Sequence, residues 1–104
     1  MRSGRLIAAT IPFLLSATLA AAALANPRFE NEVQYALEKL TSGTSSTVVI
    51  GGDRVTVTPL RTWKSVSGHY CREYALAVGK PGATPERTTG VRCRDGDGRW
   101  KMVR

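Results

Sequence analysis

The side chains best suited to nucleophilic chemistry lie in one short segment. His69, Cys71 and Glu73 are each two residues apart, so a β-strand would place them on one face. A thiol beside an imidazole and a carboxylate could act as a cysteine nucleophile with its general base. The chain has only two cysteines, Cys71 and Cys93, and in an exported protein such a pair is by default a disulfide. We favour the disulfide and predict no enzymatic activity.

A metal site is the second chemistry that the residue types allow. His69 with Asp95 and Asp97 offers an imidazole and two carboxylates. The run Asp95-Gly96-Asp97-Gly98 is similar to the start of a calcium-binding loop, but it lacks the remaining ligands and the distal glutamate. Two thiols alone cannot complete a four-ligand zinc site. The run is typical of a hairpin turn, and we expect neither a metal nor another cofactor.

The length and the charge bound the class of protein. A chain of 104 residues allows one domain, which excludes a Rossmann enzyme, a barrel or a multi-pass membrane protein. Lysine and arginine number 15 against 8 aspartates and glutamates, so the formal net charge is +7. This balance favours an anionic partner such as phosphate, nucleic acid or anionic lipid.

The first residues have the pattern of a secretory signal peptide. Arg2 and Arg5 precede an uncharged, alanine- and leucine-rich stretch that ends Ala23-Leu24-Ala25, the small-x-small pattern that signal peptidase recognises. The alternative is an N-terminal membrane anchor, because the apolar run is about long enough to span a bilayer. We predict cleavage after Ala25, so that residues 1–25 are a signal peptide and residues 26–104 form the mature domain, which has no transmembrane span.

The mature part reads as one helix followed by strands. Asn26-Pro27 is a favourable helix start, and Gly43 is the expected C′ residue after the helix. An apolar stripe at helical spacing lies between them, formed by Phe29, Val33, Leu37 and Leu40. Alternating patterns then predict strand segments at residues 47–50, 55–58, 62–66, 70–78, 88–94 and 99–103. We predict an α+β fold, with the N-terminal helix packed on an antiparallel β-meander of about four to five strands and one disulfide.

Strand pairing predicts which residues share a face. A hairpin centred on Gly82 places Cys71 directly opposite Cys93, and we place Cys93 opposite Trp100 in the next hairpin. A register slip of one residue would exchange the faces. The face expected to receive the helix carries Cys71, Ala75, Ala77, Val91, Cys93, Trp100 and Met102, with Glu73 expected to pair with Arg61 or Lys64. The other face carries Tyr70, Arg72, Tyr74, Leu76, Arg92, Arg94, Arg99 and Lys101.

The second of these faces is the candidate binding surface. Arginine can hold phosphate by bidentate hydrogen bonds, and a cation can stack on tyrosine. The alternative is a solvated face on which tyrosine and arginine stems cover each other. Because we expect export, the partners would be an anionic lipid, a glycan or another envelope protein, with nucleic acid not the main partner. The proposed contact residues are Tyr70, Arg72, Tyr74, Arg92 and Arg94.

Four segments of the chain resemble a known family. They read T-P-L-R-T-W at 58–63, G-H-Y-C-R-E-Y at 68–74, G-V-R-C-R at 90–94 and D-G-R-W-K-M-V at 97–103. They resemble the C-terminal domain of the rickettsial-type 17 kDa outer-membrane surface antigen family, whose corresponding segments are T-P-x-R-T-Y/W, G-x-Y-C-R-E-Y, A-C-R and D-G-x-W-K-I/V. The resemblance covers about residues 35–103. It implies a small β-rich envelope protein with no known catalytic role.

Antigens of that family are commonly lipoproteins with a glycine-rich segment before this domain. The present sequence has neither the lipidated cysteine nor that segment, which favours a soluble periplasmic or secreted form. We predict an exported, non-enzymatic cell-envelope protein, located in the periplasm, at the outer membrane or at the cell surface, with a structural or interaction role. The alternative function is a periplasmic anion- or lipid-binding module that uses the tyrosine/arginine face.

Overall fold

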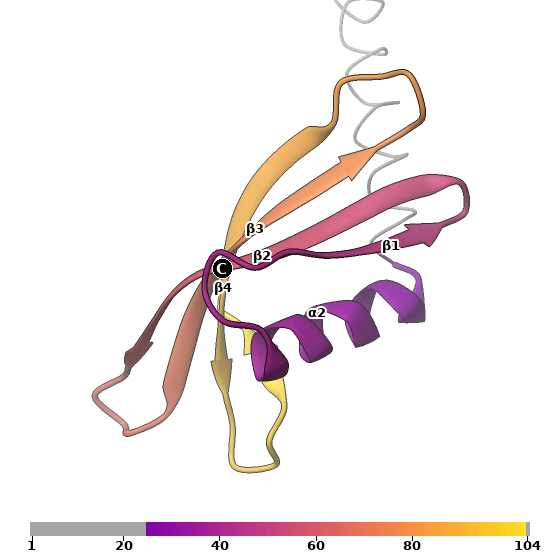
Figure 1. The fold of residues 1–104 in the computed structure, drawn as a ribbon. Helices are drawn as coiled ribbons and strands as arrows, with labels where there is room; N and C mark the ends of the chain where they lie inside the picture. Colours follow the sequence, from indigo (N-terminus) through magenta and orange to yellow (C-terminus); the bar gives the residue numbers. More distant parts are fainter. Residues whose placement is uncertain (1–24, 104) are drawn as a thin grey trace, which may run out of the picture.

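The structure is a computed structural model that describes residues 25–103. The predicted signal peptide lies outside the described residues, except for its last residue. The described part is one helix and a five-stranded antiparallel sheet in the order β1-β2-β3-β4-β5 (Figure 1), which confirms the α+β prediction. The elements are α2 (Pro27–Lys39), β1 (Ser46–Ile50), β2 (Asp53–Lys64), β3 (Tyr70–Gly79), β4 (Glu86–Arg94) and β5 (Trp100–Met102).

Helix α2 begins where the sequence predicts and ends earlier. The Asn26 side chain accepts a hydrogen bond from the Arg28 N–H at 2.9 Å, which satisfies one of the unpaired donors of the first turn. At the other end, Leu40 turns to extended backbone while its N–H still donates to the Ala36 carbonyl. Gly43 has a φ of +90° but lies in the turn that follows, so the prediction that it is the C′ residue is wrong.

Strand β2 joins two predicted strands across a proline. Pro59 lies opposite Tyr74 and Arg61 lies opposite Glu73, so Leu60 is the extra residue of a β-bulge. Proline has no N–H to lose, and a bulge is one of the few places where a sheet tolerates it. The Pro59 carbonyl instead accepts the Gly43 N–H at 2.7 Å. Because a bulge bends and twists its strand, Pro59 curves the sheet and does not end the strand.

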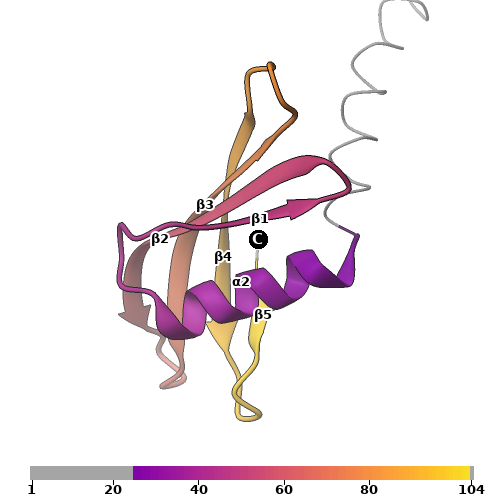
Figure 2. The ribbon, with the colours of Figure 1, turned by 45° about the vertical axis from the view of Figure 1, so that its right-hand side comes forward.

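The curved sheet wraps one face around the helix. β1 runs across the view above α2 (Figures 1 and 2), and β5 crosses behind the helix (Figure 2). Helix α2 contacts both of these edge strands. Each large apolar side chain buried between helix and sheet contributes roughly 1.5–3 kcal/mol. The core consists of Phe29, Val33, Ala36, Leu37, Ile50, Val55, Val57, Tyr74, Leu76, Val78 and Trp100.

The helix covers the opposite sheet face from the one predicted. Cys71 does lie opposite Cys93, so the predicted pairing of β3 with β4 is confirmed. The face that packs on the helix, however, carries Tyr74, Leu76 and Val78. These side chains offer more apolar area than the alanines of the other face, and burial follows that area. We call the helix-covered side the inner face and the other side the outer face.

The last hairpin is shifted by one residue from the predicted register. Arg94 lies opposite Trp100, and Cys93 lies opposite Lys101. The cause is the turn: the Asp95 N–H donates to the Arg99 carbonyl at 2.9 Å, and Gly98 adopts a φ of +83°, as three-residue hairpin loops require. The slip moves Trp100 to the inner face, because neighbouring residues of a strand point to opposite faces.

Candidate functional site

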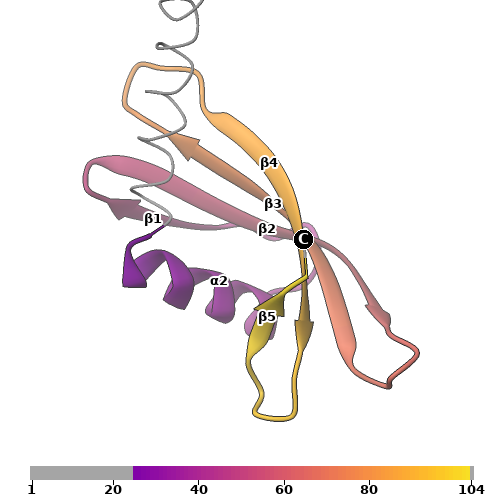
Figure 3. The ribbon, with the colours of Figure 1, turned by 180° about the vertical axis from the view of Figure 1, so that it is seen from behind.

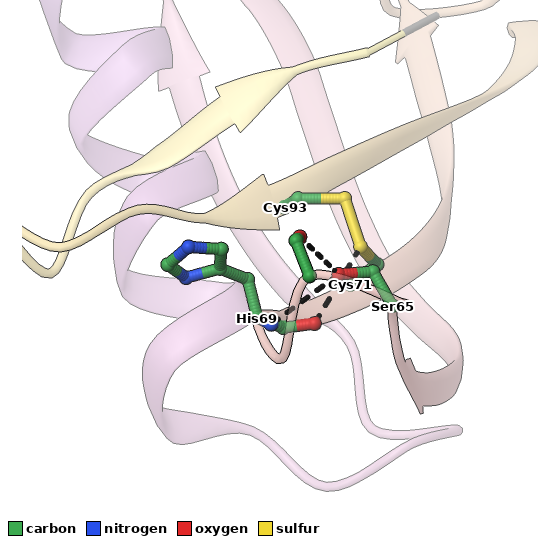
Figure 4. The surroundings of a disulfide bond; sticks show 5 residues. Ser65, His69, Cys71 and Cys93 are labelled. Atoms are coloured by element: carbon green, nitrogen blue, oxygen red, sulfur yellow. Dashed lines mark hydrogen bonds between the residues drawn. A yellow bond between two sulfur atoms is a disulfide. The ribbon is translucent and has the colours of Figure 1, made fainter.

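The two cysteines form a disulfide, as predicted. The Cys71 and Cys93 sulfur atoms are 2.03 Å apart, and the His69 ring points away from them (Figure 4). Neither cysteine therefore carries a thiol that could serve as a nucleophile in this state. Within residues 25–103, no three His, Cys, Asp or Glu side chains are grouped so that they could hold a metal ion. The Asp95 carboxylate instead accepts the backbone N–H groups of Asp97 and Arg99.

Glu73 has the ion-pair partner that the sequence suggested. Arg61 Nε lies 2.9 Å from Glu73 Oε1, on the outer face. The Arg61 guanidinium carbon also lies 4.6 Å from the centre of the Trp63 ring, which is close enough for a cation–π interaction. This pair is a structural contact, which leaves the five predicted binding residues as the remaining candidates. All five belong to the inner face.

Two of those five residues lie deep between sheet and helix. Arg92 is 4% exposed and Tyr74 is 3% exposed. Arg92 Nη1 and Nη2 donate to the two Glu30 carboxylate oxygens at 2.7 and 3.2 Å, and Arg92 Nε donates to Tyr74 Oη at 3.2 Å. Burial opposes the ionised form of Glu30, but the hydrogen bonds from Arg92 and Gln34 outweigh it, so the pKa of Glu30 lies below its usual value. Arg92 thus has a counter-ion and a full set of structural contacts.

The other three predicted residues line a shallow pocket of about 390 Å³. The pocket lies between the last turns of α2 and the facing ends of β2, β3, β4 and β5. We call it the Arg72 pocket; its walls are Leu37, Glu38, Thr62, Tyr70, Arg72, Arg94 and Trp100. The structure therefore brings Tyr70, Arg72 and Arg94 together in one pocket wall, whereas Tyr74 and Arg92 do not line this pocket. The binding role of the five residues stays a prediction.

Arg72 differs from Arg92 in having only neutral partners. The Arg72 side chain donates from Nε to Thr62 Oγ1 at 2.8 Å, from Nη1 to the Leu37 carbonyl at 2.6 Å and from Nη2 to Ser42 Oγ at 3.4 Å. Among residues 25–103, no carboxylate lies within ion-pair distance of it. Arg72 is 7% exposed, and burial lowers its pKa. A buried charge without a counter-ion is costly and uncommon in proteins.

The remaining charges of the pocket leave an excess of positive charge. Arg94 Nε lies 2.9 Å from Glu38 Oε1, and the same oxygen accepts Trp100 Nε1 at 3.0 Å. These two hydrogen bonds lower the pKa of Glu38. The Glu38 carboxylate is therefore ionised and neutralises Arg94, not Arg72. The Tyr70 ring is half exposed at the rim, with Lys64 Nζ 5.5 Å from its centre. A guanidinium has five N–H donors, and Arg72 directs three toward the protein. The arrangement can hold one carboxylate or phosphate group.

Sequence reasoning missed the helix side of this pocket. The sequence predicts Leu37 only as part of the core stripe, although its carbonyl accepts a hydrogen bond from Arg72. Glu38 directly follows Leu37 and lies at the edge of that stripe, which was the available signal. Trp100 is predicted to pack against the helix and does so, but it is predicted to share a face with Cys93 and instead lies opposite Arg94 on the inner face. These contacts could not be predicted because the sequence pattern does not show which face of the sheet packs against the helix.

The fold and the pocket define a small, disulfide-linked α+β domain in which a curved sheet wraps around one helix. Residues 36–101, well over half of the chain, match the sequence model of the 17 kDa outer membrane surface antigen family. The chain belongs to this family, and the resemblance read from its segments is confirmed.

Named relatives support the same assignment. The 17 kDa surface antigens of Rickettsia bellii and Rickettsia felis are each 39% identical over 72 residues, which is 67% of this chain and 45% of theirs. The Rickettsia prowazekii antigen is 40% identical over 52 residues, or 50% of this chain and 32% of that protein. The match thus spans less than half the length of these relatives. No solved structure is similar enough to count as a match. Within residues 25–103, no helix has the length and apolar character needed to cross a bilayer.

Proposed function

We propose that the protein is an exported, non-enzymatic component of the bacterial cell envelope with a structural or interaction role. The observation that carries this proposal is the family match over residues 36–101. The Cys71–Cys93 disulfide agrees with it, because disulfides form and persist in exported proteins. The location would be the periplasm, the outer membrane or the cell surface. Release of residues 1–25 as a signal peptide is part of the same proposal.

Cell fractionation tests this proposal directly. The full chain with a C-terminal tag is expressed in a Gram-negative host, and cytoplasm, periplasm, inner membrane and outer membrane are separated. The expected result is a protein outside the cytoplasm whose N-terminal sequence begins at Asn26. Full-length protein confined to the cytoplasm with reduced cysteines would contradict the proposal. A variant with Ala23 and Ala25 changed to Leu is the matched control, because it removes the small residues that signal peptidase recognises.

We infer a second function for the Arg72 pocket, which is to bind an acidic group of an envelope lipid or glycan. The observation that favours it is the buried Arg72 guanidinium, whose partners among the described residues are all neutral. An anion in the pocket would supply the missing counter-charge. Arg94 and the exposed part of Tyr70 would complete the contact.

Binding to anionic vesicles tests this second function. Vesicles of phosphatidylglycerol in phosphatidylcholine are compared with pure phosphatidylcholine at low and high salt. We expect binding only to the anionic vesicles, with affinity falling as salt rises. Arg72→Gln removes the charge and keeps hydrogen-bond donors, whereas Arg28→Gln removes one charge from the exposed start of α2. A loss confined to Arg72→Gln supports the pocket; equal losses in both variants, or no binding at low salt, overturn it.

A further inference from the structure

The outer face of the sheet carries a trough along β3. In the second half of β3 the residues on the outer face are Ala75, Ala77 and Gly79, while β2 and β4 place longer side chains on either side of them. Neighbouring strands are about 4.8 Å apart, so long side chains on both neighbours form walls above a floor of short ones. The register opposes Ala75 to Thr58 and Thr89, Ala77 to Thr56 and Arg87, and Gly79 to Arg54.

Two adjoining hollows occupy this trough. Their volumes are about 520 and 550 Å³, and they share Thr56, Ala77 and Arg87 as lining residues. β3 lies between β2 and β4, and the tips of the β1–β2 and β3–β4 hairpins point the same way (Figures 1 and 3). Each hollow is larger than the Arg72 pocket and falls within the usual size of small-molecule sites. We call the two together the β3 trough.

One end of the trough carries two arginines without partners among the described residues. Arg54 and Arg87 stand on opposite walls, on β2 and β4, and neither makes a side-chain hydrogen bond or an ion pair within residues 25–103. No aspartate or glutamate lines either hollow. Lys80 at the hairpin tip is held by Asp53, with Nζ 2.8 Å from Oδ1. Their backbones lie on strands two strand widths apart, about 10 Å, and are offset by two residues along the strands. Because arginine side chains are long, both guanidinium groups can reach one phosphate from these positions.

The rest of the trough suits a sugar better than a hydrocarbon chain. Its floor is the methyl groups of Ala75 and Ala77, and its walls carry hydroxyl groups. Thr56 Oγ1 is hydrogen-bonded to Thr47 Oγ1 at 2.9 Å, and Thr58 Oγ1 to Ser45 Oγ at 2.6 Å. Each hydroxyl keeps further hydrogen-bonding capacity, because a hydroxyl group can donate one hydrogen bond and accept two. A hydrocarbon chain would take that remaining capacity out of water, at a cost. A pyranose ring offers C–H groups to the floor and hydroxyls to the walls.

We propose that the β3 trough binds a phosphorylated glycan. The phosphate lies between Arg54 and Arg87, and the adjoining sugar ring lies on Ala77. This site is on the opposite face of the sheet from the Arg72 pocket and shares no residue with it. The two proposals can therefore fail independently.

An NMR titration of the exported, ¹⁵N-labelled protein tests this site. The probe is glucose 1-phosphate, with inorganic phosphate and glucose as separate arms. We expect amide shift changes along β3 and at Arg54 and Arg87, with glucose 1-phosphate the tightest ligand and glucose alone inactive. Inorganic phosphate binding as tightly as glucose 1-phosphate would overturn the proposal, as would shifts confined to the Arg72 pocket.

Three variants separate the charge from the shape of the trough. Arg87→Gln should weaken glucose 1-phosphate about tenfold, because it removes one charged hydrogen-bond donor. Ala77→Leu fills the floor and should abolish the preference for the sugar phosphate over inorganic phosphate. Arg28→Gln removes an equal charge from the helix and should change neither. The three substituted residues lie at exposed positions or on the outer face. Thermal unfolding curves that match that of the unmodified protein verify that the variants fold. Equal weakening by Arg87→Gln and Arg28→Gln would overturn the proposal.

Discussion

Two arginines that face each other across β3 and β4 have opposite electrostatic surroundings. Arg72 and Arg92 are direct cross-strand partners, and both are almost fully buried on the inner face. Arg92 is neutralised by Glu30 from α2, whereas Arg72 is held by hydroxyl and carbonyl oxygens alone. Like charges that lie opposite each other in a sheet repel. The pair has two positive charges, but only one carboxylate, that of Glu30, forms an ion pair with it among the described residues. Arg92 is therefore part of the fold, and Arg72 is the better candidate for binding an anion.

The largest effect that separates the two arginines is on stability. Arg92→Ala removes two hydrogen bonds to the Glu30 carboxylate and the partner of Tyr74 Oη. Because the Glu30 side chain is 41% exposed and its charge is partly screened by water, the free energy of unfolding should fall by about 3–4 kcal/mol. Arg72→Ala loses hydrogen bonds to neutral acceptors only and should lower it by about 1–3 kcal/mol. Urea unfolding followed by tryptophan fluorescence measures both. A loss in Arg72→Ala as large as that in Arg92→Ala would remove the contrast.

The disulfide, one residue from the arginine pair, should have the next greatest effect on stability. Changing Cys71 and Cys93 together to Ser should cost about 2–4 kcal/mol, because the unfolded chain regains the freedom of a closed loop. Reduction of the unmodified protein with dithiothreitol should give the same loss in the same urea experiment. A loss of unfolding free energy larger than that of Arg92→Ala would contradict this order, because it would mean that the disulfide also holds Arg92 in place.

The dependence of stability on pH should distinguish Arg92, which is paired with Glu30, from Arg72. The pKa of Glu30 is lowered in the folded state from its usual value of 4.5, so its contribution is complete above that value and is lost as the pH falls through the lower, folded pKa. Glu30→Gln should therefore flatten the loss of stability below about pH 4.5. Arg72→Gln should leave that slope unchanged, because Arg72 has no carboxylate partner among the described residues. Unfolding in urea between pH 2.5 and 7 measures both, and a flattened slope in Arg72→Gln would contradict the comparison.

The smallest effect concerns the rim of the Arg72 pocket. Arg94 and Glu38 are each about 40% exposed in their side chains, and ion pairs of this kind contribute at most about 1 kcal/mol. Arg94→Gln should therefore change stability by less than about 1 kcal/mol while weakening binding to anionic vesicles. Arg28→Gln is the matched control for lost charge. A large loss of stability in Arg94→Gln would place Arg94 with Arg92 among the structural arginines.

Local signals predicted most of the secondary structure. The capping pattern at Asn26-Pro27 and the stripe from Phe29 located the helix, and alternation located the strands. The main local failure was at Pro59, because a proline in a strand pattern normally indicates an end. Here the Gly43 N–H bonds the Pro59 carbonyl and the bulge at Leu60 restores the pairing, which no local pattern records.

The candidate site was predicted in its members but not in its grouping. Tyr70, Arg72 and Arg94 do line one pocket, but Glu30 and Glu38 come from the helix and decide which arginines are neutralised. Those contacts join residues about 60 positions apart in the chain. Spacing within a strand carries no information about them.

The sequence by itself determined the elements, the pairing of Cys71 with Cys93 and the family. The alternation of side chains along a strand indicates which residues share a face, and the turn at Gly82 sets the register between β3 and β4. The tertiary structure alone decided which face turns inward, because that depends on the total apolar area that Tyr74, Leu76 and Val78 offer to the helix. It also decided the position of Trp100, through the turn at Gly98. Both choices are made by packing and turn geometry, and together they made the tyrosine/arginine face an interior with one arginine left without a counter-ion among the described residues.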